Sequence, residues 1–203
     1  PKKHINSNIS EFDRIANSWH ADEVYKVIDS NIGYIYPGLF KSEDGFMIRS
    51  SIMNTKGLII DFRCYSKENL LDVISYFLFP ETTEFAKLTV VSGDEPGLFS
   101  FTNENLKIGV SNDEYYKGKV VIIINELTQS QLEYAAMALR KAPNVTIIGS
   151  NSAGANGDLH YFYLPGSIYT RITNSGVYYI DGEENQRKGI EPDIVVEPTI
   201  DGI

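Results

Sequence analysis

The sequence has few of the residues that form cross-links and metal sites. Its 203 residues include one cysteine, Cys64, so the chain can form no internal disulfide and no cysteine-based metal site. Its three histidines, His4, His20 and His160, are too scattered along the chain to indicate a metal cluster. We therefore expect no metal site.

Positive charge and long apolar runs are scarce as well. The chain has 18 Lys and Arg against 27 Asp and Glu, a net charge of −9, and no basic cluster. Such a molecule is repelled by phosphate backbones and anionic lipids, so we expect no nucleic-acid partner. The longest apolar runs, such as residues 120–124, are far shorter than the roughly 20 residues of a membrane span, and residues 1–10 lack a signal peptide's apolar segment.

What is present fits one globular domain. Hydrophobic residues make up 42% of the chain and charged residues 22%, and no Pro/Gly/Ser-rich linker or fixed-period repeat interrupts it. We expect a helical lead-in over residues 1–31, where Ser10 caps a short helix, and a core over residues 32–203.

Three β-branched apolar runs predict the centre of this core. They are continuous rather than alternating, which is typical of parallel strands covered on both faces. Between them, two segments carry apolar residues at helical spacing. The runs are residues 56–61, 118–125 and 144–149, and the helical segments are 69–79 and 131–141. The pattern predicts an α/β fold.

Right-handed crossovers would bring the loops at the carboxyl ends of these strands to one edge. Residues 61–64, 125–130 and 149–157 should therefore converge there. Before the core strands, residues 32–36 predict a strand that ends at Pro37. After them, residues 168–180 and 189–196 predict strands, with a hairpin-type turn at Asp181-Gly182.

Ser130 is the first candidate functional residue. It lies five residues beyond the strand end at Asn125 and opens a predicted helix, where unpaired N–H groups such as that of Gln131 can stabilise an anion. Ser130 and Glu133 also have the spacing of a capping box, and no G-x-S-x-G motif surrounds the serine. The spacing alone leaves nucleophile and helix cap both open.

Residues 149–157 form a second candidate feature, a run of small residues after a buried strand. Small side chains around Gly154 would let an extended substrate approach the backbone and hydrogen-bond to it as an added strand. An ordinary surface loop would have the same composition.

Residues 118–133, 144–155 and 189–195, in that order, resemble the C-terminal processing (tail-specific) and tricorn-like serine peptidase family. Residues 57–63 are similar to the family's apolar segment that ends in D-x-R, and the resemblance covers roughly residues 32–197. It implies a Clp-protease/crotonase-like layered core with a mostly parallel sheet and a C-terminal β-hairpin. It also implies a serine endopeptidase that acts on polypeptides without a cofactor, in an exported (periplasmic or cell-envelope) protein.

The resemblance gives Ser130 the role of nucleophile, the Gln131 N–H that of an oxyanion donor, and Gly154 a place in substrate binding. Two positions depart from the family pattern. Ala155 stands where tail-specific members carry a Lys base, which excludes a Ser–Lys dyad on an ungapped alignment. Lys67-Glu68 stand where the family has the glycines of its second oxyanion donor.

The general base has three candidate sources. The tricorn-like branch takes a His from upstream, which here would be His4 or His20, and His160 follows the small-residue loop. The third source is a segment outside this chain, because family members carry an N-terminal region and a PDZ domain before the core; we favour this one. Gln186 lies near the position of the family's base-orienting acid.

Two other functions remain open from the sequence. An inactive peptide-binding protein of the same fold would share the groove and lack a working base. A crotonase-type acyl-CoA enzyme would share the broad fold, but the strand ends carry no acidic pair. The carboxylates of residues 181–184 are more typical of a solvated turn than of a glycosidase acid pair.

Overall fold

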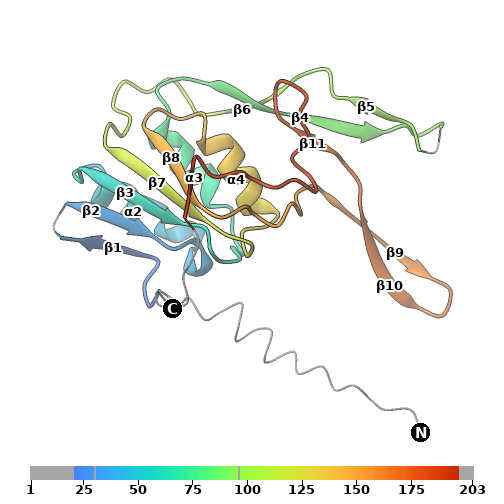
Figure 1. Ribbon diagram of the computed structural model, residues 1–203, viewed down its shortest axis with the longest axis horizontal. Helices are drawn as coiled ribbons and strands as arrows, with labels where there is room; N and C mark the ends of the chain where they lie inside the picture. The colour runs from blue at the N-terminus through green and yellow to red at the C-terminus, as the bar shows by residue number, and fades with distance from the viewer. Residues whose placement is uncertain (1–20, 30, 96, 197–203) are drawn as a thin grey trace, which may run out of the picture.

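A computed structural model describes residues 21–29, 31–95 and 97–196. Its centre is a six-stranded sheet in the order β1-β2-β3-β7-β8-β12 (Figure 1). The first pair is antiparallel and the other four are parallel. The strands are β1 (Tyr25–Ile28), β2 (Ile32–Ile35), β3 (Gly57–Asp61), β7 (Lys119–Ile124), β8 (Val145–Gly149) and β12 (Ile194–Val195).

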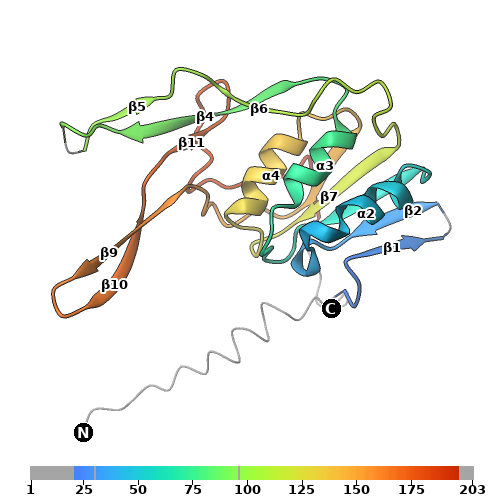
Figure 2. The ribbon, with the colours of Figure 1, turned by 180° about the vertical axis from the view of Figure 1, so that it is seen from behind.

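The two faces of this sheet differ, which corrects one expectation from the sequence. Along β7, Val120, Ile122 and Ile124 are buried whereas Val121 and Ile123 are only half-buried. The three helices α2, α3 and α4 all lie on one face (Figure 2). The continuous apolar runs therefore do not mark strands with helices on both faces. β-Branched residues extend each run, and burial alternates beneath that composition.

The helices are α2 (Gly45–Ile52), α3 (Leu70–Leu78) and α4 (Gln131–Leu139). The second and third confirm the helical segments expected from the sequence, and α2 was not predicted. Two short 3-10 helices, η1 (Pro37–Leu39) and η2 (Ser42–Asp44), lead into α2. The helices bury Ile48, Ile74 and Leu139 completely, in one core with the sheet.

A second sheet, which the sequence did not predict, lies beside α3 and α4. Its long strand β4 (Thr83–Val91) pairs with β5 (Phe99–Phe101), β6 (Leu106–Ile108) and β11 (Val177–Tyr178). Phe85 of β4 packs edge-on against Tyr134 of α4, with ring centroids 5.1 Å apart. This contact joins the second sheet to the core.

The strands β9 (Leu159–Leu164) and β10 (Ile168–Thr173) form a hairpin that projects from the domain (Figures 1 and 2). Its turn lies at Gly166 and Ser167, which both have positive φ. The strands differ from those expected, because residues 168–173 pair with residues 159–164, while β12 joins the central sheet parallel to β8. The turn expected at Asp181-Gly182 is also present, since the Gly182 N–H donates to the Tyr179 carbonyl at 2.9 Å.

The expected helical lead-in is wrong in its described part. Residues 25–28 form β1, an edge strand of the central sheet, so the core begins before residue 32. Ser10, His4 and His20 lie outside the described residues. None of the helices in the described ranges combines the length and apolar character needed to cross a membrane.

Candidate active site

The three strand-end loops converge as the sequence predicts, and Thr128 joins them. Its side chain is fully buried and its Oγ1 donates to the Phe62 carbonyl at 2.8 Å, next to the end of β3. Its own carbonyl accepts a hydrogen bond from the Ala153 N–H at 3.0 Å, in the loop after β8. These contacts fix the loop that carries Ser130.

Ser130 stands immediately before α4 with φ 54° and ψ −119°. L-residues adopt this conformation only at a cost of about 1–3 kcal/mol, and strained turns of this kind hold the nucleophiles of several hydrolases. The side chain is half-buried and lines two adjoining cavities of about 720 and 690 Å³. Ser130 is therefore at the wall of an open cleft rather than beneath packed side chains.

The capping role of Ser130 is carried by its backbone. Ser130 and Glu133 face each other as a capping box, and the Ser130 N–H donates to Glu133 Oε2 at 3.1 Å. The serine side chain itself makes no capping hydrogen bond. The Gln131 N–H begins the helix, where N–H groups have no intrahelical acceptor. A hydroxyl and a helix N-terminus thus lie together at the cleft.

Glu133 links the Ser130 turn to the loop that follows β8 through hydrogen bonds. Its carboxylate is completely buried and accepts four hydrogen bonds, which is how a buried charge is stabilised without a counter-ion. The donors are the N–H groups of Ser130 (3.1 Å), Gly154 (2.7 Å) and Ala155 (2.8 Å) and the hydroxyl of Ser152 (2.5 Å). Ser152 in turn accepts from the Ile190 N–H at 2.6 Å. One carboxylate therefore holds together the three sequence blocks that carry the family resemblance.

A second polar cluster lies at the end of β3. The buried Asp61 accepts from the Tyr34 hydroxyl at 2.9 Å and forms a two-point ion pair with Arg63, with nitrogen–oxygen distances of 2.9 and 2.8 Å. Burial, with the charge of Asp61 second, raises the pKa of the Cys64 thiol to about 12. Burial also raises the pKa of Tyr36 to about 12. The side chains of Cys64 and Tyr36 are therefore neutral at pH 7. Together with the Asp61–Arg63 ion pair they stabilise the loop that follows β3.

The small-residue loop lines the cleft in a conformation that requires glycine. Gly154 has φ 68°, and a Cβ there would lie 2.9 Å from the Arg187 carbonyl carbon. Its N–H bonds to Glu133 and its carbonyl accepts from the Arg187 N–H at 2.7 Å. The Gly154 N–H is therefore already paired, and Gly154 itself lines the larger cavity. Pairing of substrate as an added strand near Gly154 stays a prediction.

The structure does not bring His160 to the cleft. His160 is exposed on β9, and its neighbour Leu159 lines the larger cavity. Successive side chains of a strand point to opposite faces, so His160 lies on the far face of the hairpin. The described residues that line the two cavities include no His and no Lys.

Lys67 and Glu68 do not line the cleft either. Glu68 Oε2 accepts from the N–H and the hydroxyl of Ser42, both at 2.6 Å, which turns this carboxylate toward η2. From the same loop, the exposed Tyr65 lines the cavity instead. The Glu68 side chain is therefore engaged away from the two cavities that Ser130 lines.

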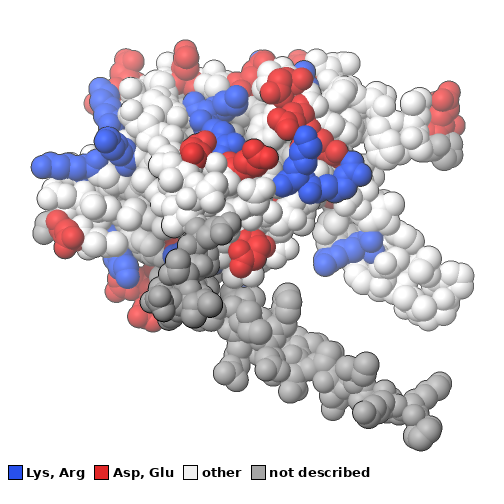
Figure 3. Space-filling view, in the orientation of Figure 1, with Lys and Arg blue, Asp and Glu red and all other residues white. Residues whose placement is uncertain are grey.

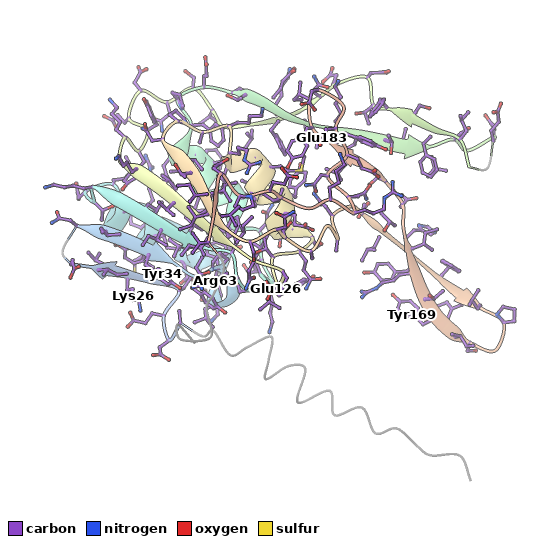
Figure 4. The ribbon with its side chains drawn as sticks, in the orientation of Figure 1. Lys26, Tyr34, Arg63, Glu126, Tyr169 and Glu183 are labelled. Carbon is purple, nitrogen blue, oxygen red and sulfur yellow. The ribbon has the colours of Figure 1, made fainter. Side chains whose placement is uncertain are left out.

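The side-chain amide of Gln186 makes structural hydrogen bonds to two backbone carbonyls rather than to a candidate base. Its Nε2 donates to the Asn156 carbonyl at 2.8 Å and to the Ser175 carbonyl at 2.9 Å. The acidic turn also behaves as expected, with exposed Asp181 and Glu183, while Glu184 pairs with Arg187 at 2.7 Å. Figure 4 shows Glu183 far from Glu126.

Sequence reasoning missed several residues of the cleft wall. Arg171, Tyr178, Glu184 and Arg187 line the larger cavity from segments remote in sequence from Ser130. No spacing signal links them to the serine, because they reach it only through the packing of β10 and β11 beside the loops.

The sequence profile of peptidase family S41 matches residues 31–196. No curated protein matches the chain.

Similar solved structures include a candidate peptidase from Parabacteroides merdae (TM-score 0.74, 21% identity, 94% of this chain and 63% of that chain). Mature CPAF is also similar (0.64, 16%, 81% and 46%), as is a photosystem II D1 C-terminal processing protease (0.55, 13%, 88% and 49%). At these identities the likeness shows the fold, and the chain spans less than two thirds of each of these proteins.

Proposed function

Because this chain belongs to peptidase family S41, we propose that it is the catalytic core of a serine endopeptidase that cleaves polypeptides. The observation that carries the proposal is the setting of Ser130. Its side chain faces a cleft of about 720 Å³ from the N-terminus of α4, in a strained backbone conformation that Glu133 helps to hold.

In the proposed reaction Ser130 Oγ attacks the carbonyl carbon of the scissile peptide bond as its proton passes to a general base. The Gln131 N–H donates to the oxyanion, and such a donor stabilises the transition state by roughly 3–4 kcal/mol. Collapse breaks the C–N bond and the base protonates the leaving amine. Water then attacks the acyl-serine ester and releases the second product.

The base in this proposal comes from outside the described wall of the cleft. The wall offers carboxyl, phenol and guanidinium groups, and Glu184 is paired with Arg187. We assign the role to an imidazole, either from His4 or His20 or from a segment outside this chain. Replacing a base of this kind should lower kcat far more than it changes KM.

We also propose a cleavage position and a cell compartment. Cleavage near substrate C-termini and export to the periplasm or cell envelope rest on the family resemblance. Fractionation of cells that make the protein tests export, and mass spectrometry of products from one substrate with free and amidated C-termini tests the cleavage position.

The decisive experiment uses the protein as the cell makes it and an unfolded substrate such as reduced, carboxymethylated casein. We expect hydrolysis by the parent protein and at least a thousandfold loss in Ser130→Ala. Retained hydrolysis in Ser130→Ala would defeat the assignment.

A second candidate is a peptide-binding protein of this fold without activity. It is favoured by Ala155 at the family's Lys position and by the absence of His and Lys among the described residues of the cleft wall. In that case the parent protein hydrolyses nothing, and Ser130→Ala binds peptide as tightly as the parent.

A further inference from the structure

The β9–β10 hairpin exposes an unusual amount of apolar surface. Eight of its large hydrophobic side chains are exposed, and the exposed fraction of Tyr163 reaches 71%. Between residues 159 and 173 the chain carries a single charged residue, Arg171. Figure 3 accordingly shows this arm almost without acidic or basic side chains. Exposed apolar area of this extent on a projecting element is typical of a binding surface.

The strand register sorts these side chains onto two faces. Residues paired across an antiparallel ladder share a face, and alternate residues switch faces. One face, the tyrosine face, consists of Leu159, Tyr161, Tyr163, Tyr169, Arg171 and Thr173. The other, the aliphatic face, consists of His160, Phe162, Leu164, Ile168, Thr170 and Ile172.

The aromatic rings of the tyrosine face are held against one another. Tyr161 and Tyr169 stack with centroids 5.6 Å apart and planes inclined by 7°, and Tyr163 lies 5.2 Å from Tyr169. In Figure 4 the labelled Tyr169 lies on the side of the hairpin toward the body of the domain. Rings already ordered in this way lose little entropy when they bind a partner.

The tyrosine face is continuous with the Ser130 cleft. Leu159, Arg171 and Thr173, at the base of this face, line the same cavity as Ser130. No residue of the aliphatic face lines either cavity that contains Ser130. Six strand residues at about 3.4 Å each give the face a length of roughly 20 Å, enough for about six residues of an extended peptide.

We propose that the tyrosine face is a binding strip for the polypeptide substrate beyond the Ser130 cleft. It takes an extended segment rich in aromatic and aliphatic side chains, and Arg171 favours a carboxylate where the segment enters the cleft. The proposal rests on the proposed function for its substrate, and it extends recognition by up to about 20 Å beyond the cavity of Ser130.

The test measures binding, which needs no general base. A fluorescent 14-residue peptide of alternating Phe, Leu and Ser is titrated into the 203-residue chain carrying Ser130→Ala, and anisotropy gives Kd. The triple variant Tyr161→Ser/Tyr163→Ser/Tyr169→Ser should raise Kd at least tenfold. The matched control Phe162→Ser/Leu164→Ser/Ile168→Ser, on the aliphatic face of the same strands, should change Kd less than twofold.

Single variants test the two faces without the risk that a triple substitution unfolds the hairpin. Tyr163→Ser and Ile172→Ser both replace exposed residues, and the first alone should weaken binding, by about threefold. Equal effects from both faces, no effect from the tyrosine face, or no binding to the parent would each overturn the proposal.

A second copy of this chain is the competing occupant. If sedimentation shows that the parent self-associates, and the tyrosine variant becomes monomeric while its Kd for peptide is unchanged, the strip is a dimer contact and the proposal fails. Labelling of Ser130 by a fluorophosphonate reports separately on the proposed function, because the probe reacts in the cleft and does not reach the hairpin.

Discussion

At the scale of single residues, a hydrogen bond couples the backbone of Ser130 to the carboxylate of Glu133. The serine has the positive φ of a strained turn, and the buried carboxylate three residues later accepts its N–H. Strain in a backbone persists only where surrounding contacts over-determine it. Glu133 provides one such contact to Ser130 and three to the loop of Ser152, Gly154 and Ala155. The family spacing of Ser and Glu is therefore a structural coupling between the candidate nucleophile and the loop that faces it.

Replacing Ser130 by glycine should make the protein more stable while it abolishes any hydrolysis. Glycine adopts φ 54° without strain, so we expect the free energy of unfolding to rise by about 1 kcal/mol. Ser130→Ala is the matched control, since it removes the hydroxyl and keeps the Cβ. Urea denaturation compares the two, and a Ser130→Gly protein less stable than Ser130→Ala would refute a strained serine.

Replacing Glu133 by glutamine should destabilise the domain by about 2–4 kcal/mol. The amide presents an NH₂ group to donors that now face a carboxylate oxygen, so buried N–H groups lose their acceptor. Glu126→Gln is the control, because Glu126 is exposed and its Oε2 accepts only a long 3.4 Å bond from Ser150. Similar unfolding midpoints for the two variants would show that the network contributes little.

The sequence predicts part of this site and not the rest. The nucleophile position, the helix that follows it and the small-residue loop come from local patterns around Ser130. The buried role of Glu133 does not, because an S-x-x-E pattern is the same whether the carboxylate caps a helix in solvent or holds a loop. Tyr65, Arg171 and Glu184 were also missed, since only tertiary packing brings them to the cleft wall.

At the scale of elements, the parallel strands position the site. β7 and β8 pair in register up to Ile124 and Gly149, and the loops of the candidate active site leave from these ends. Their apolar runs were predictable because β-branched residues in short segments favour buried strands. β4, α2 and the true hairpin turn at Gly166 were not, because their sequences lack a continuous run or a clear period. Residues 25–28 were assigned to a helical lead-in for the same reason. They form the edge strand β1, whose side chains are half-buried or exposed and give no continuous apolar run.

A side chain at Gly149 should disrupt the end of β8. Gly149 has φ 124°, and an added Cβ would overlap the carbonyl oxygen of Ile124 on β7. We expect Gly149→Ala to cost more than about 3 kcal/mol of folding free energy. Gly93→Ala, at an exposed position with no atom within 4 Å of the new Cβ, should change stability by less than about 0.5 kcal/mol. Thermal unfolding of both variants decides the matter.

At the scale of the whole molecule, one compact core carries two projecting features, the β4–β5 arm and the β9–β10 hairpin (Figure 1). Phe99 from the first and Leu159 from the second line the cavity of Ser130. The cleft therefore lies between the core and both arms. Composition and charge predict no nucleic-acid partner. Of the two arms the sequence predicts only the strand over residues 168–180, because apolar side chains that stay exposed do not follow the usual burial pattern.

The molecule should lose stability as the pH rises above about 8.5. Burial raises the pKa of Cys64 and of Tyr36 to about 12, above the roughly 8.5 and 10 of an unfolded chain. The unfolded state therefore releases these protons first, and alkaline pH favours unfolding. Urea midpoints should fall between pH 8 and pH 11, and Cys64→Ala should flatten the first part of that decline. A midpoint that rises over this range would contradict the burial of these groups.

Mapping a fluorophosphonate adduct on the protein as the cell makes it tests directly whether Ser130 is the nucleophile. We expect one adduct by intact mass, located by peptide mapping on Ser130, and none on Ser130→Gly, which keeps the fold but lacks the hydroxyl. An adduct on another residue, or an unlabelled protein that nevertheless hydrolyses unfolded casein, would contradict the claim that Ser130 is the nucleophile of this peptidase core.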